Sequence, residues 1–309
     1  MARVNTVTGP LDSSALGFCH PHEHIFTAET PASAGYPALC IDDEERSASE
    51  LADFRAAGGE TVIDCQPTGA GGDPLALRRI SLASGVHIVC VTGYHMPGFY
   101  PPGHWVFTEG APALRDRFLA ELTEGVRDPD GGGRVFPGAV KAAVGKDGPA
   151  GRFGICLRAA AGAAAEAGVP LILHTEAGAG AVESVAVCER EGLDPAHIAV
   201  CHVDRQAEDY APHEAVARTG AFLEYDTVAR PKYHDEPSEL ALIRHMLSLG
   251  YEGRLLISLD TTAARLRRYG GSPGMCYILR EFLPMLARAG VSDREIRAMT
   301  RSNPRLLFE

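Results

Sequence analysis

Eight short apolar runs recur along the 309-residue chain, each five to eight residues long. Runs of this length that are rich in Val, Ile and Leu are typical of strands buried on both faces of a parallel sheet. Helix-length stretches separate them, and several open on Pro or Ser and close on Gly. The strands are predicted at 16–20, 61–65, 87–93, 138–145, 171–175, 198–203, 222–226 and 255–260.

Strict alternation of eight strands with helices predicts an α/β protein with a closed (β/α)8 TIM barrel. A doubly wound open sheet is the alternative. Such sheets usually carry a glycine-rich turn after their first strand, and this chain has histidines there. The barrel is therefore favoured.

Two segments lie outside the repeat, and we expect residues 1–309 to form one barrel domain around them. Residues 1–16 are predicted to be a short N-terminal hairpin extension. Residues 94–111 form a loop rich in Pro, Gly and aromatic residues, which includes Trp105, the single tryptophan. A loop of this length is usually an active-site lid or binding loop. Packing against a second subunit is an equally weighted alternative.

The charge balance excludes several classes of partner. A net charge of −11 and a sequence pI near 5.6 argue against nucleic acid or an anionic membrane surface. The start of the sequence has no apolar leader segment, so we expect a cytoplasmic protein that acts on a small molecule. The eight cysteines are scattered without a CxxC pair, and we expect buried free thiols.

The motif His-Pro-His-Glu-His at 20–24 closes the first predicted strand. Residues two apart on a strand point to the same face, so His22 and His24 are expected to project together into the barrel mouth. Two imidazoles on one face are half of a metal site. Strand parity places His20 on the same face, and it cannot choose two of the three histidines.

Four further polar residues lie in or directly after other predicted strands, as the histidines of the first strand do. His174, His202 and Asp260 each stand at or beside the end of an apolar run, and Lys141 lies within one. Residues that end barrel strands converge on the carboxyl face, where barrel active sites lie. A buried histidine satisfied in the core explains any one of them, but it explains the convergence poorly.

These residues in this order resemble the phosphotriesterase-related branch of the amidohydrolase superfamily, which includes phosphotriesterase-like lactonases. The resemblance runs from the opening VNTVTGPL to the closing SNPRLLF. It implies a binuclear site for divalent ions, usually zinc, with Mn, Co or Fe as alternatives, and a homodimer. By the resemblance, one ion is held by His22, His24 and Asp260, the other by His174 and His202, and both by a carbamate on Lys141.

The chain has few lysines, and a carbamate would explain why one of them lies within a barrel strand. Lys141, Lys146 and Lys232 are its three lysines, and a bare ammonium beside two dications is repelled. A carbamate would instead supply an anionic bridge with two oxygens. The alternative is a buried lysine paired with an acid.

The mechanism that the resemblance implies uses a hydroxide shared by the two ions as nucleophile. Asp260 would be the catalytic residue that takes its proton and passes it to the leaving group. The resulting hypothesis is a hydrolase that cleaves a carbonyl ester, most simply a lactone. The alternatives are an amidase, a phosphotriesterase or other phosphoesterase on the same site, and a catalytically silent ligand-binding barrel.

Three residues are candidates for binding substrate. By resemblance, Tyr94 matches a tyrosine that lines lactonase pockets, although simple loop packing would also explain it. Arg230 and Lys232 place two cations at the barrel rim, where they would hold an anionic or phosphorylated tail. The alternative for this region, including Arg265 and Arg268, is a solvated face or salt bridges. Pro21 removes a ladder donor, and we expect local distortion there.

Overall fold

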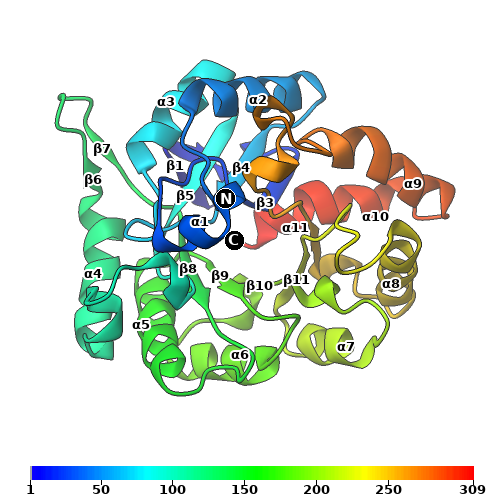
Figure 1. Ribbon diagram of the computed structural model, residues 1–309. Coiled ribbons are helices and arrows are strands. Elements are labelled where there is room, and N and C mark those ends of the chain that lie inside the picture. The colour runs from blue at the N-terminus through cyan, green and yellow to red at the C-terminus, as the bar shows by residue number, and fades with distance from the viewer. Residues whose placement is uncertain (1) are drawn as a thin grey trace.

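The computed structural model describes residues 2–309. Its eight-stranded sheet is parallel throughout and runs in the order β12-β11-β10-β9-β8-β5-β4-β3, with helices on the outside (Figure 1). The predicted (β/α)8 class is confirmed. The sheet strands are β3 (Cys19–Glu23), β4 (Thr61–Asp64), β5 (His87–Gly93), β8 (Ala139–Ala143), β9 (Leu171–His174), β10 (Ile198–Cys201), β11 (Phe222–Tyr225) and β12 (Leu255–Ile257).

Helices lie between the barrel strands, and two short strand pairs lie outside the barrel sheet. The α-helices are α1 (Pro31–Gly35), α2 (Glu44–Ala56), α3 (Pro74–Ser84), α4 (Ala111–Glu124), α5 (Arg152–Ala167), α6 (Ala181–Arg190), α7 (Ala211–Arg218), α8 (Glu236–Ser248), α9 (Leu283–Arg288), α10 (Asp293–Arg297) and α11 (Asn303–Leu306). Outside the barrel sheet, β1 (Arg3–Thr6) pairs antiparallel with β2 (Gly9–Asp12), and β6 (Val126–Arg127) pairs with β7 (Arg134–Val135).

Two apolar layers result from the alternation of side chains along the strands. One layer fills the barrel interior and includes Val89, Ile172 and Phe222. The other lies between the strands and the helices and forms the larger core cluster. All eight cysteines are free, and six of them are buried. No helix among residues 2–309 is long and apolar enough to cross a membrane.

Hydrogen bonds join the first barrel strand, β3, to the residues that follow the last one, β12. We call this junction the seam of the barrel. The backbone N–H of Asp260 donates to the carbonyl of His22 at 3.2 Å. The buried carboxylate of Glu23 accepts from the N–H groups of Leu259 and Thr261 at 3.0 and 3.1 Å. Glu23 therefore serves barrel closure at the level of the candidate site.

The first barrel strand is irregular, as Pro21 suggested. Its pairing with β4 shifts register between His20 and Glu23. The ring of His20 consequently packs on Phe54 of α2, with centroids 4.8 Å apart, and its Nδ1 lies 2.8 Å from a carboxylate oxygen of Glu23. The parity prediction that placed His20 with His22 is wrong, because the shift breaks the alternation. The strand also ends three residues later than predicted.

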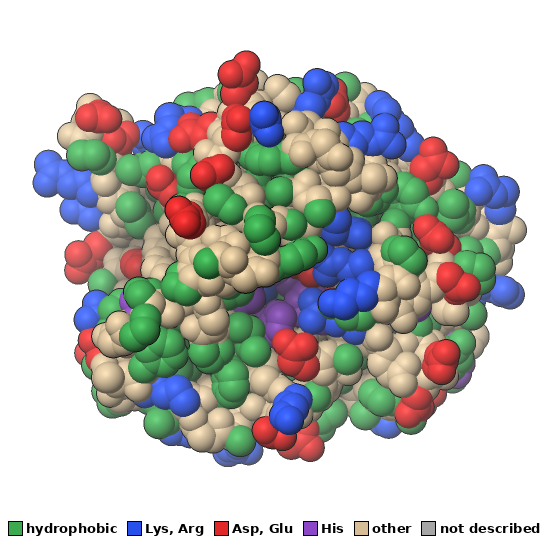
Figure 2. Space-filling model, viewed as in Figure 1, with side chains coloured by type: hydrophobic (Ala, Val, Ile, Leu, Met, Phe, Trp, Pro, Cys, Tyr) green, Lys and Arg blue, Asp and Glu red, His purple; other side chains and the backbone are tan. Residues whose placement is uncertain are grey.

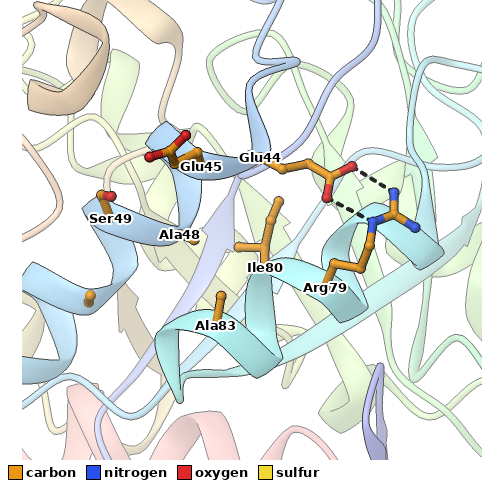
Figure 3. A pocket seen from close by; sticks show the side chains of 8 residues that line it. Glu44, Glu45, Ala48, Ser49, Arg79, Ile80 and Ala83 are labelled. Atoms are coloured by element: carbon orange, nitrogen blue, oxygen red, sulfur yellow. Dashed lines mark hydrogen bonds and ion pairs between the residues drawn. The ribbon is translucent and has the colours of Figure 1, made fainter.

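Helices α2 and α3 pack side by side on the outside of the barrel. Between them lies a surface groove of about 430 Å³, whose lining includes Ala48, Ile80 and Ala83. Figure 3 shows the carboxylate of Glu44 reaching across to the guanidinium of Arg79, with contacts of 2.6 and 2.8 Å. This groove has small and charged walls but none of the convergent histidines that mark the barrel mouth.

Candidate metal centre

The histidines and acids singled out in the sequence converge at the carboxyl ends of the strands. His22 lies within β3, and His24 follows that strand by one residue. The others come from distant parts of the chain: Lys141 from the middle of β8, His174 from the end of β9, His202 from the residue after β10, and Asp260 from three residues past β12.

One group of ligand atoms is already compact. Nitrogen atoms of His22 and His24 and a carboxylate oxygen of Asp260 lie within 4.8 Å of one another. His22 and Asp260 are buried, and the side chain of His24 is 12% exposed. The Oδ1 atom of Asp260 is 3.5 Å from Nε2 of His24 and 3.9 Å from Nε2 of His22. Two imidazoles and a carboxylate that face one point are a donor set suited to zinc or a similar divalent ion.

A second group adjoins it. Nε2 of His202 lies 2.9 Å from Nδ1 of His174. Nζ of Lys141 lies 3.1 Å from Nε2 of His22, and the lysine is fully buried. Lys141 forms no ion pair with an acid anywhere in residues 2–309. The expected alternative of a buried lysine paired with an acid is therefore not what the structure has, and a carbamate with divalent ions fits these residues.

The protonation of these groups suits ligation. Burial lowers the pKa of His22, His174 and His202 below the usual range, so their rings are neutral and can bind a cation. Burial opposes ionisation of Asp260. Nevertheless the guanidinium of Arg230, 2.6 Å away, holds the pKa of its carboxyl well below the ordinary value. Asp260 is thus a carboxylate at neutral pH.

Two candidate ligands have unusual backbones. His202 has φ of 66° and Asp260 has φ of 48°, in the left-handed region that L residues with side chains rarely adopt. Such a conformation costs about 1–2 kcal/mol per residue. Strain of this kind concentrates at functional sites, and here it turns two strand ends toward the same point.

Asp226, which sequence reasoning did not assign to the site, holds both groups together. Its Oδ2 lies 2.9 Å from Nδ1 of His22, and its Oδ1 lies 2.6 Å from Nδ1 of His202. A carboxylate that binds Nδ1–H leaves Nε2 of each ring free for a metal. Asp226 directly follows β11. The criterion that selected Asp260, a polar residue at the end of a buried strand (the strand-end rule), therefore also applies to Asp226.

A cavity of about 640 Å³ opens above these residues. Figure 2 shows histidines at the bottom of a hollow in this face, with lysine and arginine side chains along one side. Its walls include His95, Met96 and Phe99 from the 94–111 loop, as well as four cations: Arg205, Arg230, Lys232 and Arg265.

Arg230 and Lys232 both reach this cavity, in different ways. The guanidinium of Arg230 donates to the carboxylate and the backbone carbonyl of Asp260, at 2.6 and 2.8 Å. Lys232 is exposed and lies 5.0 Å from the ring centre of Tyr233. Arg265 is buried, donates to the carbonyls of Val228 and Ala229, and has its pKa lowered to about 10 by burial.

Tyr94, by contrast, is not brought to this cavity. Its hydroxyl donates to the carbonyl of Ala143 at 2.7 Å, and the side chain is buried beneath the loop. The next residue, His95, lies on the cavity wall instead, and burial lowers the pKa of its ring. The chain turns at Gly93, where φ is 112° and a Cβ would lie 2.0 Å from the carbonyl oxygen of Lys141.

Known proteins resemble the chain over most of its length. The sequence model of the phosphotriesterase family matches residues 2–308. A phosphotriesterase-related protein of Nematostella vectensis is 30% identical over 284 residues, which cover 86% of this chain and 78% of the relative. A phospho-furanose lactonase of Mycoplasmopsis synoviae is 26% identical over 321 residues, which cover 98% of this chain and 90% of the relative.

The fold comparison leads to the same group. The crystal structure of the lactonase Lmo2620 from Listeria monocytogenes superposes with a TM-score of 0.90 at 26% identity, and 99% of each chain is covered. The matches and the cluster of ligand-type residues together identify a metal-dependent hydrolase. The chain belongs to the phosphotriesterase family.

Proposed function

We propose that this protein hydrolyses a lactone that carries an anionic group, using a binuclear metal site. The observation that carries the proposal is the pairing of a metal-ligand cluster with a cationic wall in one cavity. Lys232 is exposed and forms no ion pair within residues 2–309, so its ammonium is free to bind an anion. Arg265 forms no ion pair there either, and it adds positive charge to the wall while two backbone carbonyls hold its guanidinium. On a chain of net charge −11, a local concentration of cations favours an anionic substrate.

The residues that would hold the ions lie at the bottom of the cavity or directly beneath it. His22, His24 and Asp260 would bind one ion, His174 and His202 the other, and a carbamate on Lys141 would join them. When bound, two divalent ions lower the pKa of water and polarise the carbonyl group of the substrate.

Asp260 is the residue placed to move the proton. It is a carboxylate, and it lies between the histidines and the cationic wall. As water attacks the carbonyl carbon, Asp260 accepts the proton that water loses. It then delivers this proton to the ring oxygen when the carbonyl carbon–oxygen bond breaks. The product is a hydroxy acid, and the carboxylate of Asp260 is restored.

The cations would place the substrate rather than react with it. Arg265 is fixed by its two carbonyl partners, whereas Lys232 is exposed and forms no hydrogen bond within residues 2–309. An anionic tail bound along this wall would direct the lactone carbonyl toward the floor. Orientation of this kind accounts for a large part of the rate acceleration by enzymes.

The test begins with metal content and a substrate panel. We expect about two divalent ions per chain and an added carbon dioxide on Lys141 in the intact mass. The panel compares phosphorylated sugar lactones with neutral lactones, N-acyl amides and phosphotriesters. A preference for an amide or a phosphoester would replace the lactone assignment but keep the site. A protein that takes up no zinc in bicarbonate would favour the silent barrel.

A matched pair of lysine variants tests the anionic tail. Lys232 and Lys146 are both exposed, but Lys146 does not line the cavity. We expect Lys232→Ala to raise KM for an anionic lactone roughly fivefold or more and to spare a neutral lactone. Lys146→Ala controls for the loss of one positive charge. Equal changes in the two variants, or for the two substrates, would contradict the assignment.

A further inference from the structure

His95 occupies the part of the cavity wall that lies over the junction of the two ligand groups. It follows β5 by two residues, at the start of the 94–111 loop. Its ring centre is 6.1 Å from that of His24 and 5.4 Å from that of His174. One of these histidines belongs to each of the two proposed ligand groups. A substrate that reaches both groups therefore passes the ring of His95.

The proton of the His95 ring has a defined place. Nδ1 accepts a hydrogen bond from the backbone N–H of Met96 at 2.7 Å. A backbone N–H can only donate, so Nδ1 carries a lone pair and the proton of the neutral ring is on Nε2. No group within residues 2–309 forms a hydrogen bond with Nε2. An N–H donor is thus left for a ligand in the cavity.

The ring is also held in position. The backbone N–H of His95 donates to the hydroxyl of Tyr100 at 2.8 Å, which fixes the start of the loop. Phe99 packs on the ring with centroids 4.3 Å apart. The side chains of Met96 and Phe99, which line the cavity beside it, carry no N–H or O–H group. His95 therefore presents the fixed side-chain donor on the part of the wall that these loop residues form.

We propose that His95 is a catalytic hydrogen-bond donor whose Nε2–H binds the substrate oxygen that gains negative charge during hydrolysis. The inference rests on the proposed function, since it requires a carbonyl or phosphoryl oxygen above the ligand cluster. No proton is transferred in this role: the ring stays neutral, and the hydrogen bond strengthens as charge develops. Removing one such fixed donor typically lowers kcat about 10²- to 10³-fold.

A second histidine in the same loop supplies a matched control. Nδ1 of His104 also accepts a backbone N–H from within the loop, that of Val106 two residues along the chain, at 3.2 Å. Its ring packs on Trp105, with centroids 4.4 Å apart, and it does not line the cavity. Substitution of His104 tests loss of a loop histidine without loss of a donor in the cavity.

The experiment uses the metal-loaded protein and three variants. We expect His95→Phe to lower kcat about 100-fold with little change in KM or in metal content. We expect His95→Gln, whose amide N–H can replace Nε2–H, to recover at least tenfold over His95→Phe. His104→Phe should stay within twofold of the parent protein. A normal kcat in His95→Phe, or an equal loss in His104→Phe, would overturn the proposal, as would loss of metal from His95→Phe.

A binding measurement separates this proposal from the choice of substrate. Butylphosphonate carries a tetrahedral anion and can be titrated by calorimetry whichever bond the enzyme cleaves. We expect its Kd to rise about tenfold or more in His95→Phe and to be unchanged in His104→Phe. In protein labelled with ¹⁵N-histidine, we expect the Nε2–H signal of His95 to shift on binding. An unchanged Kd in His95→Phe refutes the role of His95 even if the protein proves to be an amidase.

Discussion

Replacement of Asp226 by asparagine should remove one of the two metal ions that we propose. Asp226 binds Nδ1 of His22 through Oδ2 and Nδ1 of His202 through Oδ1. Oδ2 also accepts the backbone N–H of His202 at 3.2 Å. Asparagine has one acceptor oxygen, and we expect it at the Oδ2 position because two donors meet there. The amide NH2 then faces Nδ1 of His202.

This orientation forces His202 into the wrong tautomer. Nδ1 must accept from the amide, so the ring proton moves to Nε2 and blocks the atom that would bind an ion. Loss of an outer hydrogen-bond partner alone costs about 10- to 100-fold in metal affinity, or about 1.4–2.7 kcal/mol. Because the tautomer is also wrong, we expect the affinity for the ion held by His174 and His202 to fall by about 100-fold or more. The ion held by His22, His24 and Asp260 should remain.

The assay is metal content after equilibration in a zinc buffer that saturates the parent protein. We expect about one ion per chain in Asp226→Asn instead of about two, and a fold unchanged by circular dichroism. The control is Glu224→Gln, on the same strand. Glu224 is equally buried, burial raises the pKa of its carboxyl, and it accepts from Ser258 at 2.6 Å without contact to a candidate ligand. Two tightly bound ions in Asp226→Asn, or equal loss in Glu224→Gln, would refute the reasoning.

Three further predictions concern the same site. Asp260→Asn should lower kcat by about 10²- to 10⁴-fold while elemental analysis finds near-normal metal, and full activity would exclude its role as proton carrier. Lys141→Met should bind fewer ions than the parent protein, and bicarbonate should not restore them; a normal metal content would exclude the carbamate. The metal-free protein should lose stability as pH falls below about 6.5, since burial lowers the pKa of His22, His174 and His202 when folded, and the unfolded chain then binds the protons. Urea unfolding at pH 7.5, 6.5 and 5.5 measures this loss, at most about 1.4 kcal/mol per histidine per pH unit, and a free energy of unfolding independent of pH would contradict it.

The strand-end rule explains why most of the site could be predicted. Buried parallel strands have an unmistakable apolar pattern, and polar residues at their ends have few other reasons to be there. His174 and His202 follow from this rule directly. Asp226 satisfies the same criterion as Asp260, since each follows the end of a buried strand, but it was left out of the predicted site.

The positions of two side chains, those of His20 and Tyr94, could not be predicted without the backbone structure. His20 left the face of His22 because the register of β3 shifts at Pro21, and alternation cannot reveal such a shift. Tyr94 was expected to line the pocket, and His95 lines it instead, because the strand ends at Gly93, whose φ of 112° departs from extended backbone. Sequence patterns predict the direction of side chains within regular elements, and both differences arise where regularity ends.

The seam of the barrel links metal binding to the order in which the chain is made. The bonds from Glu23 to Leu259 and Thr261 join residues 236 and 238 positions apart, and the candidate ligands His22 and Asp260 meet at the same place. A growing polypeptide has its first histidines long before it has the aspartate that completes the set. Metal uptake should thus follow synthesis of nearly the whole chain, and a nascent or truncated product would be left without it. An ion held there would link the first and last barrel strands to each other. Only a chain that has been synthesised through Asp260 would then bind it.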